Sequence, residues 1–295
     1  MTTDLVFTRL GETSCELAES PVWDAVNGAL LWVDIPQGVI HQRHLATGAQ
    51  QSWRLGDVIG SIGLARSGRL VVARQHEVGF FDRHTGAYEK LASVGPADAG
   101  LRLNDGKVGP DGAFWVGSMD LSGQSRPVGT LYRVQADGTV EAKCAGLITS
   151  NGLAWSADGE TLFHSDSRGC WIDRWNFDAS SGAISARTRI ATPGMGDGRP
   201  DGGATDAAGT YWSAGVSAGC LNRYARDGRV LARLALPVAA PTMPCFGGED
   251  LRTLFVTSLR KGPQDGPLEG AILTARVECP GVPVAVFADY VASAM

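Results

Sequence analysis

Short apolar segments alternate with tight polar turns along the whole chain. Six stretches share one pattern, in which two short apolar runs flank a turn. They are SPVWDAVNGALLWVDI, IGLARSGRLVVARQ, GKVGPDGAFWVGSMD, GLAWSADGETLFHSDS, GGATDAAGTYWSAGV and CFGGEDLRTLFVTS. Short runs that are continuously apolar or alternate in polarity are typical of strands rather than helices. Each stretch is therefore predicted to be a β-hairpin, and no segment has the periodicity of an amphipathic helix.

The turns repeat at a regular spacing. Glycine marks the turn in five of the hairpins and an acidic pair marks it in the sixth: Gly28, Gly68, Gly112, Gly159, Gly209 and Glu249-Asp250. Successive turn glycines lie 40 to 50 residues apart, which is the length of a four-stranded propeller blade. A second turn follows each hairpin, at Thr47-Gly48, Thr85-Gly86, Asp137-Gly138, Ser181-Gly182, Asp227-Gly228 and Pro280-Gly281.

Six repeats of four strands predict an all-β protein, a six-bladed β-propeller with four antiparallel strands per blade. Residues 1–295 are predicted to form it as a single domain. A pair of β-sandwiches is the alternative, but neither a linker nor a break in composition divides the chain.

Composition agrees with this fold and narrows the class of partner. The 39 glycines among 295 residues are nearly twice the usual share of about 7%, which fits many tight turns. With 26 basic and 31 acidic residues the net charge is −5. Binders of nucleic acid or anionic membranes need clustered Lys and Arg, so neither partner is expected. The sequence also lacks a membrane-spanning apolar run and a secretory signal, so we expect a cytoplasmic protein.

One position of the repeat carries oxygen-bearing side chains. The residue eight or nine places before each turn begins the innermost strand, where it faces the propeller axis. The residues at this position are Glu19, Gly60, Asn104, Asn151 and Asp201, followed by Thr242 or Met243 in the last repeat. Equivalent positions of a propeller converge at one end of its central channel, so these side chains are predicted to meet.

Two carboxylates and two amides at one place need a compensating charge, because they would otherwise repel and be poorly solvated. A divalent cation supplies that charge, and oxygen ligands suit hard cations such as Ca²⁺, Mg²⁺ or Mn²⁺, with Zn²⁺ and Fe²⁺ as alternatives. Each motif alone is also a common turn sequence, as in Asn151-Gly152. Their shared position in the repeat favours a site.

The motifs around these positions identify a family. They are ESPVW with Glu19, RLNDG with Arg102 and Asn104, TSNGLAWS with Asn151, RPDGG with Asp201, and CFGGEDLRTLFVTS. From Glu19 to Ser258 the chain resembles the gluconolactonase and regucalcin (senescence marker protein) family, SMP-30/gluconolactonase/LRE-like. The resemblance implies a six-bladed propeller with one divalent metal ion at Glu19, Asn151 and Asp201. Ca²⁺ is the first candidate, and Zn²⁺, Mn²⁺, Mg²⁺ and Fe²⁺ are the alternatives.

The same resemblance implies a reaction, the hydrolysis of a small-molecule sugar lactone to an aldonic acid. Arg102 and Asn104 match the substrate-contacting positions of the family. Vertebrate members carry an acidic residue shortly after the segment that corresponds to residues 117–119, and this residue helps to bind the sugar. Asp120 follows that segment here and is the candidate substrate contact. Gly203 stands where the family has a larger residue.

A mechanism follows from these assignments. A metal ion polarises a lactone carbonyl and lowers the pKa of a bound water molecule. Asp201 is the candidate general base, which takes a proton from the attacking water and returns it to the leaving ring oxygen. No HExxH or GxSxG motif offers a competing catalytic set.

Two other functions remain open from the sequence. One is a metal-dependent hydrolase of phosphotriesters or other esters on the same propeller, which would prefer apolar to polyhydroxylated substrates. The other is a non-catalytic propeller that binds calcium or a protein, since fold does not determine function. A monomer or a weak homodimer is expected in each case.

Overall fold

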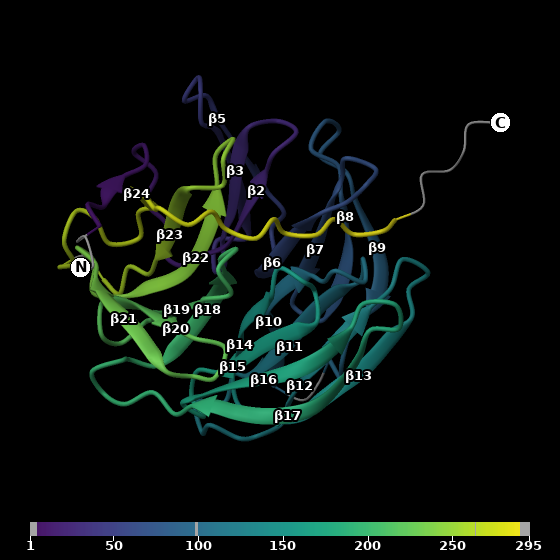
Figure 1. The fold of residues 1–295 in the computed structure, drawn as a ribbon. Coiled ribbons are helices and arrows are strands. Elements are labelled where there is room, and N and C mark those ends of the chain that lie inside the picture. Colours follow the sequence, from purple (N-terminus) through teal and green to yellow (C-terminus); the bar gives the residue numbers. More distant parts are fainter. Residues whose placement is uncertain (1–4, 98–99, 263, 290–295) are drawn as a thin grey trace.

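The computed structural model describes residues 5–97, 100–262 and 264–289. Within these residues the chain forms 24 strands and no helix. The strands make six antiparallel sheets of four strands each, arranged around a central axis (Figure 1). The prediction of an all-β six-bladed propeller is confirmed. No helix in the described part of the chain has the length and apolarity needed to cross a membrane.

The first three blades follow the chain in order from the innermost strand outward. Blade 1 consists of β2 (Ala18–Asp24), β3 (Ala29–Asp34), β4 (Val39–His44) and β5 (Gln50–Arg54). Blade 2 consists of β6 (Ile59–Leu64), β7 (Leu70–Arg74), β8 (Glu77–Phe81) and β9 (Tyr88–Ser93). Blade 3 consists of β10 (Leu101–Val108), β11 (Phe114–Asp120), β12 (Gly129–Val134) and β13 (Val140–Leu147).

The last three blades continue the pattern, except that the final strand comes from the other end of the chain. Blade 4 consists of β14 (Ser150–Trp155), β15 (Thr161–Asp166), β16 (Trp171–Asp178) and β17 (Ala183–Ala191). Blade 5 consists of β18 (Pro200–Thr205), β19 (Tyr211–Gly215), β20 (Cys220–Tyr224) and β21 (Val230–Ala235). Blade 6 consists of β22 (Pro241–Gly247), β23 (Thr253–Ser258), β24 (Leu273–Arg276) and β1 (Thr8–Arg9).

The outer hairpin predicted for the sixth repeat, with its turn at Pro280-Gly281, is wrong. Strand β24 pairs with β1, with Thr8 opposite Thr274, and Leu10 N donates to Ile272 O at 2.8 Å. Gly281 instead forms an isolated bridge with Asp206 of blade 5. The reason is ring closure: a strand from the start of the chain completes the last blade and joins the two ends of the propeller.

Six innermost strands form a closed ring, in which each of β2, β6, β10, β14, β18 and β22 contacts the next. Each of these strands has a β-bulge near its start. The register shifts lie between Glu19 and Val22, Ile59 and Ser61, Leu103 and Gly106, Asn151 and Ala154, Pro200 and Gly203, and Pro241 and Pro244. A bulge bends a strand and redirects its side chains. The repeated bulge therefore presents an equivalent position of each blade at the same end of the channel.

The opposite end of the channel is covered by the C-terminal segment 280–289, which crosses the ring as the yellow trace in Figure 1. Val282 N donates to Thr205 O of blade 5 at 2.9 Å, and Phe287 N donates to Leu64 O of blade 2 at 2.8 Å. Between this segment and the inner strands lies a cavity of about 310 Å³, whose lining includes Lys107. The segment thus connects blades that are distant in sequence.

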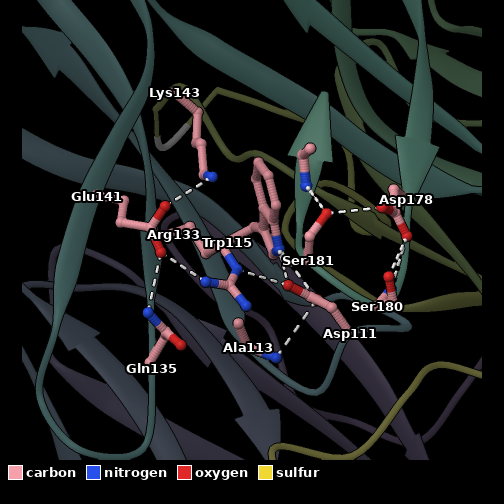
Figure 2. Close-up of polar contacts among 11 residues, drawn as sticks. Asp111, Ala113, Trp115, Arg133, Gln135, Glu141, Lys143, Asp178, Ser180 and Ser181 are labelled. Atoms are coloured by element: carbon pink, nitrogen blue, oxygen red, sulfur yellow. Dashed lines mark hydrogen bonds and ion pairs between the residues drawn. The ribbon is translucent and has the colours of Figure 1, made fainter. Parts of the chain in front are cut away.

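A charged network at the same end connects the turn between β10 and β11 to the outer strands of blade 3 (Figure 2). Asp111 Oδ2 accepts a hydrogen bond from Arg133 Nε at 2.7 Å, and Asp111 Oδ1 accepts one from Trp115 Nε1 at 3.2 Å. Arg133 also pairs with Glu141 at 2.5 Å, and Glu141 pairs with Lys143 at 2.8 Å. The buried Asp111 carboxylate therefore links the turn to β11 and β12, and Arg133 extends the network to β13.

Candidate metal and substrate site

The structure places the predicted site residues at the bulges of the inner ring. Glu19, Asn104, Asn151 and Asp201 lie at the bulges of β2, β10, β14 and β18. Gly60 occupies the position in blade 2, and a Cβ atom there would lie 2.5 Å from Leu103 O. Blade 2 therefore contributes no side chain, because the backbone of blade 3 passes too close.

Hydrogen bonds between blades anchor the main chain just before three of these residues. The carbonyl preceding Glu19, Asn151 and Asp201 accepts in each case from a side chain of the preceding blade. The bonds are Thr242 Oγ1 to Ala18 O (2.6 Å), Asn104 Nδ2 to Ser150 O (2.9 Å) and Ser167 Oγ to Pro200 O (2.5 Å). Thr242 is therefore the member of the set in β22. Hydrogen bonds from the preceding blade thus fix the main chain next to each of the three oxygen donors that the repeat aligns in sequence.

The backbone around Glu19 adopts a conformation that ordinary residues rarely take. Ser20 has φ of 48°, in the left-handed region, and the residue at the equivalent place after Asn151 is Gly152 with φ of 69°. The turn directs Ser20 N onto Glu19 Oε2 at 2.8 Å. Left-handed residues persist at functional sites where the surroundings hold them, so the bulge and its contacts define where the Glu19 carboxylate points.

The carboxyl groups of three blades influence one another. Burial raises the pKa of Glu19 well above its usual range, and the negative charges of Asp201 and Asp105 raise it further, opposed by Ser20 N and Arg102. Burial also raises the pKa of Asp201 to about 8, with a further contribution from Asp105. These shifts reflect the burial of the carboxyl groups and the influence of each negative charge on the others.

The donor set fits a hard divalent cation. Asn151 Nδ2 donates to Ser167 Oγ at 2.8 Å, so the amide is oriented and Oδ1 is left without a donor among the described residues. Among all described residues, none donates a hydrogen bond to the Asp201 carboxylate, and only Ser20 N donates one to the Glu19 carboxylate. Asp105 Oδ1 is buried and likewise has no partner there. Oxygens without donors, beside carboxyl groups whose pKa values are raised by burial, are what a cation would stabilise.

No group of three His, Cys, Asp or Glu side chains that could hold a metal ion occurs among residues 5–97, 100–262 and 264–289. The predicted set contains only two such residues, Glu19 and Asp201, and its third member is the amide oxygen of Asn151. Amide oxygens are ordinary ligands for Ca²⁺ but poor ones for softer metals. The oxygen donors of this set therefore favour Ca²⁺ over the softer metals that are bound by His or Cys.

Arg102 and Asn104 form a pair beside these oxygens. Arg102 Nη1 donates to Asn104 Oδ1 at 2.8 Å and to Leu103 O at 2.9 Å. Burial lowers the pKa of Arg102 to about 10, while Glu19 and Asp201 favour its charged form. Because Asn104 also donates to Ser150 O, both ends of its amide have protein partners, and it orients Arg102. The predicted contacts of both residues with substrate stay predictions.

Asp120 lies at the end of β11, where its carboxylate accepts hydrogen bonds from the following loop. Ser122 donates to it through N at 3.2 Å and Oγ at 2.6 Å, and Arg126 donates through N, Nε and Nη2. The Ser122 hydroxyl and Arg126 hold the pKa of Asp120 far below its usual range. Asp120 thus stabilises the loop of residues 121–128, and its predicted contact with the sugar stays a prediction.

Two charged residues of β10, Asp105 and Lys107, were missed from the sequence. Asp105 is only 3% exposed, and its Oδ2 accepts from Leu153 N at 3.0 Å. Lys107 is buried as well, and its Nζ donates to Gly203 O at 2.6 Å. The available signal was the presence of two opposite charges in a strand that the repeat assigns to the innermost, buried place. The RLNDG motif conceals it, because Asn-Asp-Gly is also a turn sequence.

Comparison with known proteins identifies the relationship. Residues 17–260 match the family model described as SMP-30/Gluconolactonase/LRE-like region. The chain belongs to this family. It is 36% identical over 278 residues to the 6-deoxy-6-sulfogluconolactonase of Pseudomonas putida, a match that covers 92% of this chain and 95% of that protein. It is 34% identical to a pentonolactonase of Haloferax volcanii, over 86% of this chain and 85% of the relative.

The solved structure of a regucalcin from Agrobacterium tumefaciens, described as a calcium-binding protein, has a TM-score of 0.89 to this chain at 27% identity, and the match covers 97% of both chains. The resemblance stated from the motifs is therefore confirmed. Lactonases among the relatives also confirm that the chain is an enzyme of the class predicted, a hydrolase that acts on a carboxylic ester.

Proposed function

We propose that this enzyme is a metal-dependent sugar lactonase, which hydrolyses an aldono-lactone to the aldonic acid. The observation that carries the proposal is the set of donor-free oxygens of Glu19, Asn151 and Asp201 beside Arg102, at one end of the channel in a lactonase-family propeller. Two relatives whose names state different sugar lactones support the substrate class. The arrangement offers carboxylate and amide oxygens for a cation and the Arg102 guanidinium for a polyhydroxylated ligand.

Glu19, Asn151 and Asp201 would hold one divalent cation, with Ca²⁺ as the first candidate. The calcium-binding regucalcin neighbour and the all-oxygen donor set support this choice. When bound, such an ion supplies positive charge that stabilises the oxyanion formed from the lactone carbonyl. Its charge would also lower the pKa of the Asp201 carboxyl from the raised value, so that the group is ionised and can act as a base at neutral pH.

The residues of the chain then have separate tasks. Asp201 accepts a proton on a carboxylate oxygen from the water that attacks the carbonyl carbon. It returns this proton to the ring oxygen when the bond between the carbonyl carbon and that oxygen breaks, which leaves the aldonic acid. Arg102, oriented by Asn104, donates hydrogen bonds to oxygens of the substrate, because a guanidinium presents several N–H groups in a fixed plane.

The test is proton release from a panel of aldono-lactones by the purified protein. Turnover is measured before chelation, after chelation, and after single divalent metals are restored. We expect turnover that chelation abolishes and that Ca²⁺ or another divalent ion restores. Turnover that resists complete metal removal would contradict metal dependence, and turnover of phosphotriesters but of no lactone would contradict the substrate class.

A further inference from the structure

Strand β10 of blade 3 contacts the main chain of the two strands that carry Asn151 and Asp201. Asp105 Oδ2 accepts a hydrogen bond from Leu153 N of β14 at 3.0 Å. Lys107 Nζ reaches further along the channel and donates to Gly203 O of β18 at 2.6 Å. Both side chains are almost fully buried, with exposed fractions of 3% and 9%. One inner strand therefore connects to the two blades that follow it.

The two contacted atoms occupy the same place relative to the site. Leu153 lies two residues after Asn151, and Gly203 lies two residues after Asp201. Leu153 lies inside the bulge between Asn151 and Ala154, and Gly203 is the residue at which regular pairing resumes after the bulge that contains Asp201. A backbone group in a bulge needs another partner when it is buried. Asp105 supplies this partner for Leu153 N, and Lys107 binds the main chain where the bulge that contains Asp201 ends.

The charges of Asp105 and Lys107 also affect the net charge around the cation site. Three carboxyl groups, Glu19, Asp105 and Asp201, share the interior, and a single divalent cation compensates only two negative charges. Lys107 is the buried cation that acts on Asp105. The positive charge of Lys107 offsets that of Asp105, so the carboxylates left for the cation are those of Glu19 and Asp201, which also have Arg102 beside them.

We propose that Asp105 and Lys107 are positioning residues for the cation site: Asp105 fixes the segment that carries Asn151, and Lys107 fixes the segment that carries Asp201. The proposal rests on the metal site described under the proposed function. Neither residue touches the cation or the substrate in this role. Both act on where the ligand oxygens lie and on the net charge around them.

The test measures cation affinity directly, by calorimetric titration of the metal-free protein with Ca²⁺ and with Mn²⁺. Lys107→Met keeps most of the side-chain volume and removes the amine. We expect its dissociation constant for the cation to rise about 10–100-fold, the usual effect of losing a partner behind a metal ligand. The control is Lys143→Met, the same change in the same blade at the charged network of Figure 2, which should leave the dissociation constant unchanged.

Lys107→Met leaves the buried Asp105 carboxylate without the positive charge of the lysine, so this variant could fail to fold. The double variant Asp105→Asn/Lys107→Met removes both charges and keeps a side-chain oxygen for Leu153 N, and only the donor to Gly203 O is lost. We expect the folded double variant to bind the cation at least tenfold more weakly than the wild type. Binding within twofold of the wild type by either folded variant would overturn the proposal.

Lactone turnover by the same proteins distinguishes this inference from the proposed function. At saturating cation, displaced ligands should lower kcat with little effect on KM, since Arg102 still binds the substrate. A wild type that binds cation without cleaving any lactone would contradict the proposed function and leave the affinity test decisive for positioning. A wild type that binds no divalent cation would overturn the positioning roles of Asp105 and Lys107.

Discussion

Asp201 combines two demands in one side chain, as a proposed cation ligand and as the proposed base. Its carboxylate has no hydrogen-bond donor among the described residues, and its pKa is raised to about 8 by burial and by Asp105. A cation can therefore replace the proton that the isolated carboxyl group would retain at neutral pH. A substitution that removes the charge of Asp201 but keeps its volume therefore tests both roles.

We expect Asp201→Asn to lower kcat for a lactone about 10²–10⁴-fold, because the amide cannot accept the proton from water and contributes one negative charge less to the cation. The variant keeps its shape and should stay folded. Asp227→Asn, in the exposed turn between β20 and β21 of the same blade, is the matched control and should keep full activity. A folded Asp201→Asn protein with nearly normal turnover would contradict the assignment of the base.

His164 gives a second test at the residue scale, this time of stability. Its imidazole is fully buried in β15, with Nε2 2.9 Å from Ser150 Oγ, and burial lowers its pKa to about 4. In the unfolded chain the group takes up a proton near pH 6.5, whereas in the folded protein it does so only near pH 4. The stability that depends on neutral His164 is therefore complete above pH 6.5 and is lost as the pH falls towards 4.

We expect the free energy of unfolding to fall by about 2 kcal/mol more for the wild type than for His164→Gln between pH 7 and pH 4.5. Glutamine keeps a polar group for Ser150 and does not titrate. Urea unfolding midpoints of both proteins at the two pH values provide the measurement. Parallel pH dependences of the two proteins would show that His164 is not the group responsible.

At the scale of elements, a blade depends on the turn that joins its inner strands. Asp111 in the turn between β10 and β11 is buried with Arg133 of β12, and Arg133 continues to Glu141 of β13 (Figure 2). A buried carboxylate of this kind contributes little net stability when paired, but its removal leaves Arg133 without its main partner. The cost should therefore exceed that of losing an exposed turn residue.

We expect Asp111→Ala to lower the free energy of unfolding by about 3 kcal/mol in urea titrations. The matched control is Asp178→Ala at the exposed end of β16, whose carboxylate accepts hydrogen bonds from Ser180 and Ser181 (Figure 2). Its loss should be much smaller. Equal losses for the two variants would mean that the network of blade 3 does not hold the blade together.

The elements of the fold differ in how far the sequence predicts them. Alternating strands and turn glycines such as Gly68 and Gly159 predict the blades, because a tight turn between two short strands is determined locally. The position of Glu19, Asn151 and Asp201 follows from the repeat alone. The roles of Asp105 and Lys107 do not, since their partners are backbone atoms of other blades, which no local pattern specifies.

The whole molecule adds a constraint that no single repeat contains, which is closure of the ring. Pro280-Gly281 has the form of the other outer turns, yet the fourth strand of blade 6 is β1, because pairing strands from the two ends of the chain in one blade closes the ring. The C-terminal residues are then free to cross the channel end opposite the site. There Phe287 is fully buried against Phe80, with ring centroids 5.7 Å apart.

This crossing segment should stabilise the propeller without affecting the site. Phe287→Ala removes an aromatic ring from the core between blades 2 and 3, and we expect a loss of about 3–5 kcal/mol in the free energy of unfolding. Val286→Ala, one residue away and 38% exposed, is the control and should cost far less. Because residues 282–288 lie at the end of the channel away from Glu19 and Asp201, the cation affinity of the folded Phe287→Ala protein should equal that of the wild type. A weakened cation affinity in this variant would mean that the two ends of the channel are coupled through the inner ring, and that blade packing and the site cannot be treated separately.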